Sequence, residues 1–195
     1  MQGLVDLSRV VSHALRHEPW VYELELDAEG WVPVESLIFA LRAAVPECSS
    51  LTADDLSRMI SEADKKRHEL VGGRIRALYG HSTPFRLLKV KAEPPAFLYH
   101  GTTPFAVATI RQQGLRPMSR QYVHLSADIA TAQQVGRRKT KAPELLQIKA
   151  AAASASGVPF YRGNEKVWLA DAIPSAFIGS ILATGQGTWD AEPSK

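Results

Sequence analysis

The sequence has a single cysteine and no long apolar run. Among its 195 residues only Cys48 carries a thiol, which excludes an intrachain disulfide and a zinc site built on several cysteines. No apolar run is long enough to cross a membrane, and Met1-Gln2-Gly3 lacks the basic and apolar regions of a signal peptide. These absences predict a cytoplasmic protein with no membrane partner.

Nucleotide-binding loops and metal-ligand clusters are also missing. The chain has no G-x-G-x-x-G sequence and no Walker-type loop, so a Rossmann or P-loop nucleotide site is not supported. Its six histidines are scattered, with no carboxylate or cysteine at ligand spacing, which argues against a metal site. His13 is expected on a helix surface and His68 on a strand surface.

Basic residues are unevenly spread, although the formal net charge is only +3. Residues 65–91 contain eight basic residues and one acid, and residues 111–149 contain eight basic residues and two acids. The acids lie mainly before residue 65. This distribution predicts a localised surface for an anion such as a nucleic acid. A solvated basic face explains the same charges equally well, and charge alone does not separate the two.

The first part of the chain shows three helical patterns followed by a strand pair. The helical patterns cover residues 6–17, 35–44 and 52–63, and the strand patterns cover residues 68–71 and 74–78. Gly72-Gly73 supplies a two-residue turn between the strands. Three helices and a basic hairpin predict a winged-helix lobe over residues 1–92. Such folds are often used on nucleic acids, but the fold alone does not establish that use.

Pro94-Pro95 predicts a linker, and beyond it short strands and short helices alternate. The strand patterns cover residues 96–99, 122–126, 144–149, 159–161, 167–170 and 176–182, and the helical patterns cover residues 104–113 and 128–135. The small residues 150–156 are expected to form a loop or a frayed helix. The whole chain is therefore predicted to be α+β, with a second lobe over residues 93–195.

Two short stretches contain side chains that could bind a ligand, and each also has a purely structural explanation. Tyr99-His100-Gly101-Thr102 links a strand to a helix, and its ring, open backbone and hydroxyl suit a polar, planar ligand. A strand-end turn with a glycine, however, needs no ligand. Arg16 and His17 end the first helix, where the helix dipole favours cations whether or not they bind anything.

Eight short motifs, taken together and in order, indicate a protein family. They are Leu15-Arg16-His17, Gly30-Trp31-Val32, Asp64-Lys65-Lys66-Arg67, Ile75-Arg76-Ala77 with Gly80-His81-Ser82, Leu98-Tyr99-His100-Gly101-Thr102, Gly114-Leu115 with Met118-Ser119-Arg120, Val123-His124-Leu125-Ser126, and Val167-Trp168-Leu169. Over residues 7–181, this series resembles the tRNA 2'-phosphotransferase family.

The resemblance implies an NAD-dependent transferase that removes an internal 2'-phosphate from RNA, as left at a tRNA splice junction. The RNA 2'-phosphate first attacks the nicotinamide-bearing ribose carbon of NAD and expels nicotinamide. The 2''-hydroxyl of that ribose then attacks the phosphodiester, releasing RNA with a free 2'-OH and ADP-ribose 1'',2''-cyclic phosphate. The implied fold has a winged-helix lobe followed by an ADP-ribosyltransferase-like lobe of small antiparallel sheets with short helices.

The family's catalytic set of three arginines and one histidine corresponds here to Arg16, His17, Arg67 and Arg120. The planar guanidinium group grips phosphate oxygens in pairs and stays protonated, so the arginines are expected to hold the 2'-phosphate. His17 is expected to contact the attacking ribose hydroxyl, either orienting it or moving its proton.

For NAD, used as a co-substrate, the resemblance assigns the backbone of Gly101 to the nicotinamide carboxamide, and His100 and Thr102 to the riboses. His124 and Ser126 are expected to line the same site. Further candidates for contact with phosphate or RNA are Lys66, Arg76, His81 and Arg138. No metal is implied.

Several positions differ from the family's usual residues, and none of them belongs to the catalytic set. Lys66 stands where Gln is usual, His68 where Phe is usual, and Lys139-Thr140 where His-Gly is usual. Val167-Trp168-Leu169 lacks the catalytic glutamate of many protein-modifying ADP-ribosyltransferases, although Glu165 is close. That absence fits an acceptor that is already anionic.

Three other functions stay open at this point. They are an ADP-ribosyltransferase that caps terminal phosphates of RNA or DNA, a winged-helix nucleic-acid-binding protein without catalysis, and a degenerate family member that binds NAD as a sensor. The preferred hypothesis is the phosphotransferase, acting as a monomer on tRNA-like RNA that carries an internal 2'-phosphate.

Overall fold

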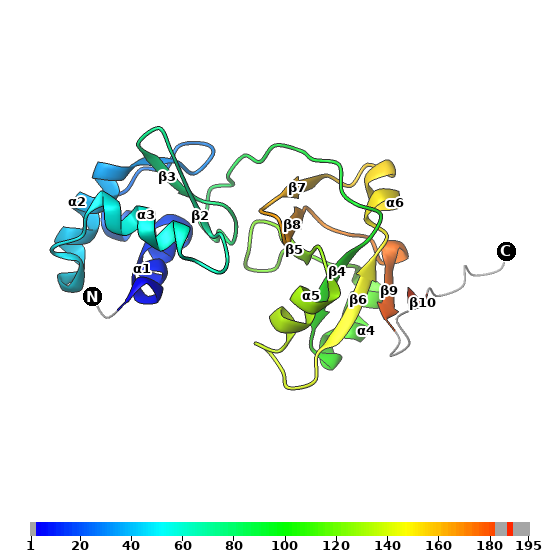
Figure 1. The fold of residues 1–195 in the computed structure, drawn as a ribbon. Coiled ribbons are helices and arrows are strands. Elements are labelled where there is room, and N and C mark those ends of the chain that lie inside the picture. Colours follow the sequence, from blue (N-terminus) through cyan, green and yellow to red (C-terminus); the bar gives the residue numbers. More distant parts are fainter. Residues whose placement is uncertain (1–2, 182–186, 189–195) are drawn as a thin grey trace. The chain divides into compact units, whose positions relative to one another are not determined.

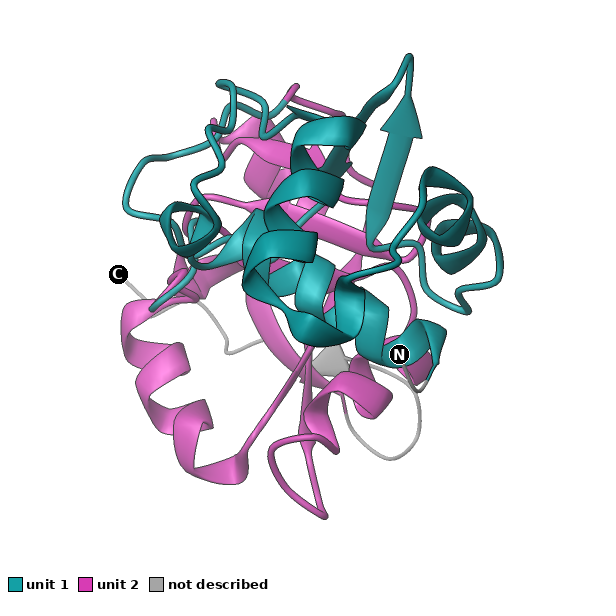
Figure 2. Ribbon diagram, turned by 90° about the vertical axis from the view of Figure 1, so that its left-hand side faces the viewer, with its two compact units in different colours: residues 1–89, 119–121 teal, residues 90–118, 122–195 magenta. Residues whose placement is uncertain are grey.

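The structure, a computed structural model, describes residues 3–181 and 187–188. The chain divides into two compact units (Figure 2). Unit 1 comprises Met1–Lys89 and Ser119–Gln121, and unit 2 comprises Val90–Met118 and Tyr122–Lys195. Each unit has its own buried apolar core. The short segment 119–121 therefore packs with residues that precede it by thirty positions or more.

The described part of unit 1 is built from three helices, two short 3-10 helices and three strands. In chain order they are α1 (Leu4–Arg16), η1 (Pro19–Tyr22), β1 (Val32–Pro33), α2 (Val34–Ala44), η2 (Pro46–Cys48), α3 (Ala53–Ser61), β2 (His68–Val71) and β3 (Arg74–Ala77). Figure 1 labels α1, α2, α3, β2 and β3. The apolar stripe of α1, which includes Leu7, Val11 and Leu15, is buried in the core. A capping box between Thr52 and Asp55 begins α3. The three predicted helices are confirmed.

The strands of unit 1 form an antiparallel sheet in the order β1-β3-β2. In the β2–β3 hairpin, His68 lies opposite Ala77 and Leu70 lies opposite Ile75. Gly72 and Gly73 both have positive φ, as a tight two-residue turn requires. The predicted hairpin is thus confirmed.

The described part of unit 2 contains a seven-stranded antiparallel sheet in the order β10-β9-β6-β4-β5-β8-β7, together with three helices and one 3-10 helix. The strands are β4 (Leu98–Thr102), β5 (Val123–Ser126), β6 (Glu144–Ile148), β7 (Phe160–Arg162), β8 (Val167–Ala170), β9 (Ile178–Ile181) and β10 (Gly187–Thr188). The helices are α4 (Pro104–Gln113), α5 (Ile129–Gly136), α6 (Ala150–Ala155) and η3 (Ser175–Phe177).

Residues 150–155 form the helix α6, which corrects the expectation of a loop or frayed helix. Alanine is the best helix former, and the buried Ala150 and Ala153 pack into the core of unit 2. A run of small residues shows no apolar stripe, so its sequence pattern did not reveal the packing. With six helices and two antiparallel sheets among the described residues, the predicted α+β class is confirmed.

Strand β4 lies at the centre of the unit 2 sheet and is paired unequally on its two sides. Five residue pairs join it to β6, from Leu98↔Ile148 to Thr102↔Glu144. A single pair, Tyr99↔Ser126, joins it to β5. Residues 100–102 are thus paired with β6 but have no partner residue in β5. The sheet opens at this point, where α5 also packs against β4 (Figure 1).

No helix among the described residues is long and apolar enough to cross a membrane. The described part of the chain also contains no group of three or more histidine, cysteine or acidic side chains that would hold a metal ion.

Candidate functional site

Three arginines of unit 1 lie close together. Arg16 ends α1, Arg67 immediately precedes β2, and Arg120 belongs to the segment 119–121. Nη2 of Arg16 donates a hydrogen bond to the carbonyl oxygen of Arg67 at 3.1 Å. A Cβ atom placed on Gly80 would lie 3.2 Å from Nη1 of Arg120 and 3.4 Å from Nη1 of Arg16. Both guanidinium groups therefore end beside this glycine, and we call the three side chains the arginine cluster.

The arginine cluster concentrates positive charge. Burial, together with the charges of Arg67 and Arg120, lowers the pKa of Arg16 to about 10, while Tyr79 acts in the opposite direction. Among the described residues, no carboxylate forms an ion pair with Arg16 or Arg67, and the buried Nε of Arg16 has no hydrogen-bond partner. The positive charge of Arg67 lowers the tendency of Arg16 to stay charged, and an anion with several oxygens would relieve their repulsion.

His17 caps the C-terminal end of α1, directly after Arg16. Its Nδ1 lies 2.8 Å from Oγ of Ser82, and the backbone N–H of Ser82 donates to the carbonyl oxygen of Arg16 at 2.9 Å. Burial lowers the pKa of His17, and the nearby charges of Arg16, His13 and Arg120 lower it further. The imidazole is therefore neutral at neutral pH, with one ring nitrogen able to accept a proton.

The segment that carries Arg120 is held in unit 1 by Gln121. The side-chain Nε2 of Gln121 donates to the carbonyl oxygen of Phe85 at 2.7 Å and to Oγ1 of Thr83 at 2.9 Å. Its Oε1 accepts from the backbone N–H of Leu87 at 3.1 Å. Sequence reasoning missed this residue, because a lone glutamine in a loop gives no signal that its carboxamide will bind another loop.

His68 is buried, with 4% of its surface exposed, so the expectation of a surface position is wrong. Its Nε2 lies 3.1 Å from Oγ of Ser12 on α1. The side chain of the first residue of β2 faces the helices rather than solvent. Burial lowers the pKa of His68 to about 3, and the positive charges of Arg16 and Arg67 contribute to this shift.

Because His68 is neutral when folded, acid should destabilise the protein. The unfolded chain gains a proton on this side chain below its ordinary pKa of 6.5, whereas the folded chain gains it only near 3. Stability is thus fully present above pH 6.5 and falls as the pH drops toward 3. From about pH 8 to about pH 5, this one group should remove about 2 kcal/mol of unfolding free energy.

Urea unfolding of the wild type and of His68→Phe at these two pH values measures the effect. The other titrating groups are common to both proteins, so the variant should lose about 2 kcal/mol less than the wild type. An equal acid-induced loss in the two proteins would show that His68 is protonated in the folded state as readily as in the unfolded chain.

Arg76, a further candidate for phosphate or RNA contact, already has partners. Its guanidinium group donates to Glu69 at 2.8 Å and to Glu29 at 3.1 Å, and it stacks 4.3 Å from the ring centroid of Trp31. Two carboxylates neutralise this arginine, which distinguishes it from Arg16 and Arg67.

The other three candidates for phosphate or RNA contact differ in their exposure to solvent. Lys66 is exposed beside Arg67. His81 is buried, with 3% of its surface exposed, between Gly80 and Ser82. Arg138 is exposed in the turn that follows α5 in unit 2. Of these, Lys66 and Arg138 are accessible to a large ligand.

In unit 2, His100 of β4 and His124 of β5 both use Nδ1 as a hydrogen-bond donor. Nδ1 of His100 donates to the carbonyl oxygen of His124 at 2.9 Å, and Nδ1 of His124 donates to that of Tyr122 at 2.9 Å. When Nδ1 carries the hydrogen in a neutral ring, Nε2 is an acceptor. Burial lowers the pKa of His100, and Lys139 lowers it further, which keeps that ring neutral.

The other residues predicted to bind NAD lie on the same two strands. Thr102 ends β4 and Ser126 ends β5, and both are buried, with 4% and 6% of their surfaces exposed. A Cβ atom on Gly101 would overlap the carbonyl oxygen of Ala132 and lie 3.0 Å from the backbone nitrogen of Gly136, both on α5. Close packing of α5 on β4 therefore already requires glycine at this position.

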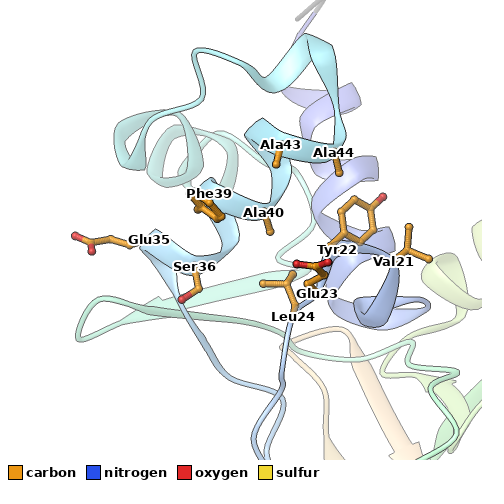
Figure 3. Close-up of a pocket in the computed structure, with 10 residues that line it drawn as sticks. All are labelled: Val21, Tyr22, Glu23, Leu24, Glu35, Ser36, Phe39, Ala40, Ala43 and Ala44. Carbon is orange, nitrogen blue, oxygen red and sulfur yellow. The ribbon is translucent and has the colours of Figure 1, made fainter.

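The structure also contains a surface pocket in unit 1, between η1 and α2 (Figure 3). Its volume is about 770 Å³. Small and apolar side chains line it together with Glu23 and Glu35. Two carboxylates would repel a phosphate, and no predicted site residue lines the pocket. The candidate anion site is therefore the arginine cluster and not this pocket.

The sequence is similar to those of known proteins. The sequence model of the RNA 2'-phosphotransferase, Tpt1 / KptA family matches residues 2–172. That range includes every candidate site residue in both units.

Several curated proteins named "Probable RNA 2'-phosphotransferase" are similar over nearly their whole length. The protein from Bacillus thuringiensis subsp. konkukian is 56% identical over 173 residues, covering 89% of this chain and 93% of the relative. The one from Acetivibrio thermocellus is 53% identical, covering 88% and 94%. The one from Pectobacterium atrosepticum is 43% identical, covering 89% and 96%.

Proposed function

The chain belongs to the RNA 2'-phosphotransferase, Tpt1 / KptA family, and from this premise we propose that it is an NAD-dependent enzyme acting on RNA with an internal 2'-phosphate. The phosphate is transferred to NAD through an ADP-ribosylated RNA. The products are 2'-OH RNA, nicotinamide and ADP-ribose 1'',2''-cyclic phosphate.

The arginine cluster is the observation that carries this proposal. A phosphate dianion is already nucleophilic and needs no general base to attack a sugar carbon. Its negative charge must be neutralised and its orientation fixed. The guanidinium groups of Arg16 and Arg120, which both lie beside Gly80, can do both. The uncompensated charge of Arg16 and Arg67 also suits the transition state of phosphoryl transfer, whose negative charge is spread over several oxygens.

His17 supplies the proton chemistry of the second step. That step needs a hydroxyl to lose its proton, and a neutral imidazole beside the arginine cluster can accept it. Burial, with the charges of Arg16 and Arg120, holds the pKa of His17 below its ordinary value, so the ring is in the accepting form at neutral pH. In this proposal His17 moves the proton, and the arginines hold the phosphate.

For NAD, the proposal assigns the opening between β4 and β5. A planar carboxamide both donates and accepts hydrogen bonds, which suits the backbone of residues 100–102, where β4 has no partner residue in β5. Nε2 of His100 and Nε2 of His124 are acceptors for ribose hydroxyls. When bound, NAD supplies an electrophilic ribose carbon with nicotinamide as its leaving group.

The proposal extends to the folds of the units. In unit 1 the element order α1, β1, α2, α3, β2, β3 and the sheet order β1-β3-β2 support a winged-helix fold. In unit 2 the antiparallel sheet that opens between β4 and β5 supports an ADP-ribosyltransferase-like fold. We propose in addition that the enzyme works as a cytoplasmic monomer in tRNA processing.

Product analysis tests the function. The protein is mixed with NAD and an RNA oligonucleotide carrying one internal 2'-phosphate, and both reactants are followed by mass spectrometry. The same oligonucleotide without the 2'-phosphate is the control. Loss of the phosphate together with formation of ADP-ribose cyclic phosphate is the expected result. ADP-ribose attached to terminal phosphates would favour a capping enzyme, and NAD left unconsumed with either RNA would reduce the protein to a nucleic-acid binder.

A further inference from the structure

The tripeptide Gly80-His81-Ser82 contacts three of the four residues to which the proposed function assigns catalysis. Gly80 lies against the guanidinium groups of Arg16 and Arg120. Ser82 is joined to the end of α1 twice, through its backbone N–H to the carbonyl of Arg16 and through Oγ to Nδ1 of His17. The backbone bond satisfies a carbonyl that has no partner within its own helix. It therefore fixes the Ser82 hydroxyl relative to the imidazole.

We propose that Ser82 is a positioning residue, which holds His17 in the tautomer with hydrogen on Nδ1 and so presents Nε2 as the proton acceptor. The inference rests on the proposed function, in which His17 takes the proton of the hydroxyl that attacks in the second step. Ser82 itself touches no reacting atom in this proposal.

The choice of tautomer follows from what happens when His17 gains a proton. A serine hydroxyl either donates or accepts, so it fits either neutral tautomer at 2.8 Å. Once the ring is protonated, both nitrogens carry hydrogen, and Ser82 can only accept from Nδ1. In the Nδ1–H tautomer this hydrogen bond already exists, so nothing rearranges. In the other tautomer Nε2–H would point at the substrate hydroxyl and could not take its proton.

Nitrogen-15 NMR of the imidazole in the free protein tests the tautomer without any substrate. Signals are assigned to His17 by their loss in His17→Ala. Wild type and Ser82→Thr should show hydrogen on Nδ1, whereas Ser82→Ala should shift the population toward hydrogen on Nε2. Ser61→Ala, which removes a hydroxyl bound to a carbonyl at the end of α3, is the matched control and should leave His17 unchanged. Hydrogen on Nε2 in the wild type would overturn the proposal, and so would an unchanged tautomer in Ser82→Ala.

Single-turnover kinetics test the functional consequence. Ser82→Ala should slow the second step about tenfold or more, less than His17→Ala does, with Ser82→Thr restoring most of the rate. In a His17→Ala background, Ser82→Ala should cause little further loss, because its effect is transmitted through the ring. Equal slowing in both backgrounds would overturn the positioning role. If the wild type releases no 2'-phosphate at all, the proposed function fails, and the NMR result still decides whether Ser82 sets the tautomer.

Discussion

Replacing Arg120 by alanine should lower the rate of 2'-phosphate removal about a thousandfold and leave the protein folded. The side chain of Arg120 is exposed, so its truncation opens no cavity in the core. Its Nη1 reaches the space beside Gly80 that Nη1 of Arg16 also reaches. The variant therefore removes part of the positive charge offered to a phosphate, and with it stabilisation that is strongest in the transition state.

Two further variants separate charge from geometry and from general damage. Arg120→Lys keeps the charge but loses the planar fork, so it should recover only part of the lost rate. Arg58→Ala is the matched control, because Arg58 is exposed in the same unit and pairs with Glu62 at 3.3 Å, outside the arginine cluster. It should turn over like the wild type. The rate is measured by single-turnover loss of the 2'-phosphate, and a near-wild-type rate in Arg120→Ala would remove this residue from the site.

The elements that could be predicted from the sequence are those with a strong local pattern. Helix α1 follows from the spacing of its apolar residues, and the β2–β3 hairpin follows from the paired glycines at its turn. For α6 the sequence did not decide between a loop and a helix, because alanines give no apolar stripe. The burial of His68 was missed because alternation along a four-residue strand does not reveal which face turns inward.

The site residues were predicted by resemblance, and the reason that local patterns could not find them is physical. Nothing in the sequence around Arg120 indicates that residues 119–121 pack with unit 1. The contacts that hold this segment and orient His17 are long-range: Gln121 binds residues 34 to 38 positions away, and Ser82 binds a ring 65 positions away. Such contacts depend on the tertiary fold and leave no periodic signal.

Gly101 was singled out from the sequence as a ligand-binding residue, but the structure gives a different reason for a glycine at this position. Its backbone was assigned to the carboxamide of NAD by the family resemblance. The structure shows that the close neighbour on the side where Cβ would lie is protein, namely Ala132 and Gly136 of α5. The glycine is thus explained by helix packing, whether or not a ligand contacts its backbone.

The methyl group added in Gly101→Ala would clash with backbone atoms, which cannot move aside by changing rotamer as a side chain can. The variant should consequently lower the free energy of unfolding by about 3 kcal/mol or more. In a chain of this length that corresponds to a fall in Tm of about 10 °C. Gly157→Ala is the control, because Gly157 has φ of +98° but nothing within 4 Å of its Cβ position. It should lose only the backbone strain of about 1–2 kcal/mol.

Thermal unfolding of both variants tests this account, and a Gly101→Ala protein as stable as the wild type would contradict it. The result also decides how NAD binding should be probed. If Gly101→Ala moves α5, then a loss of NAD affinity in this variant reports helix displacement and not a missing ligand contact. The informative variant for NAD is His100→Ala, which deletes the ring while keeping glycine where α5 requires it.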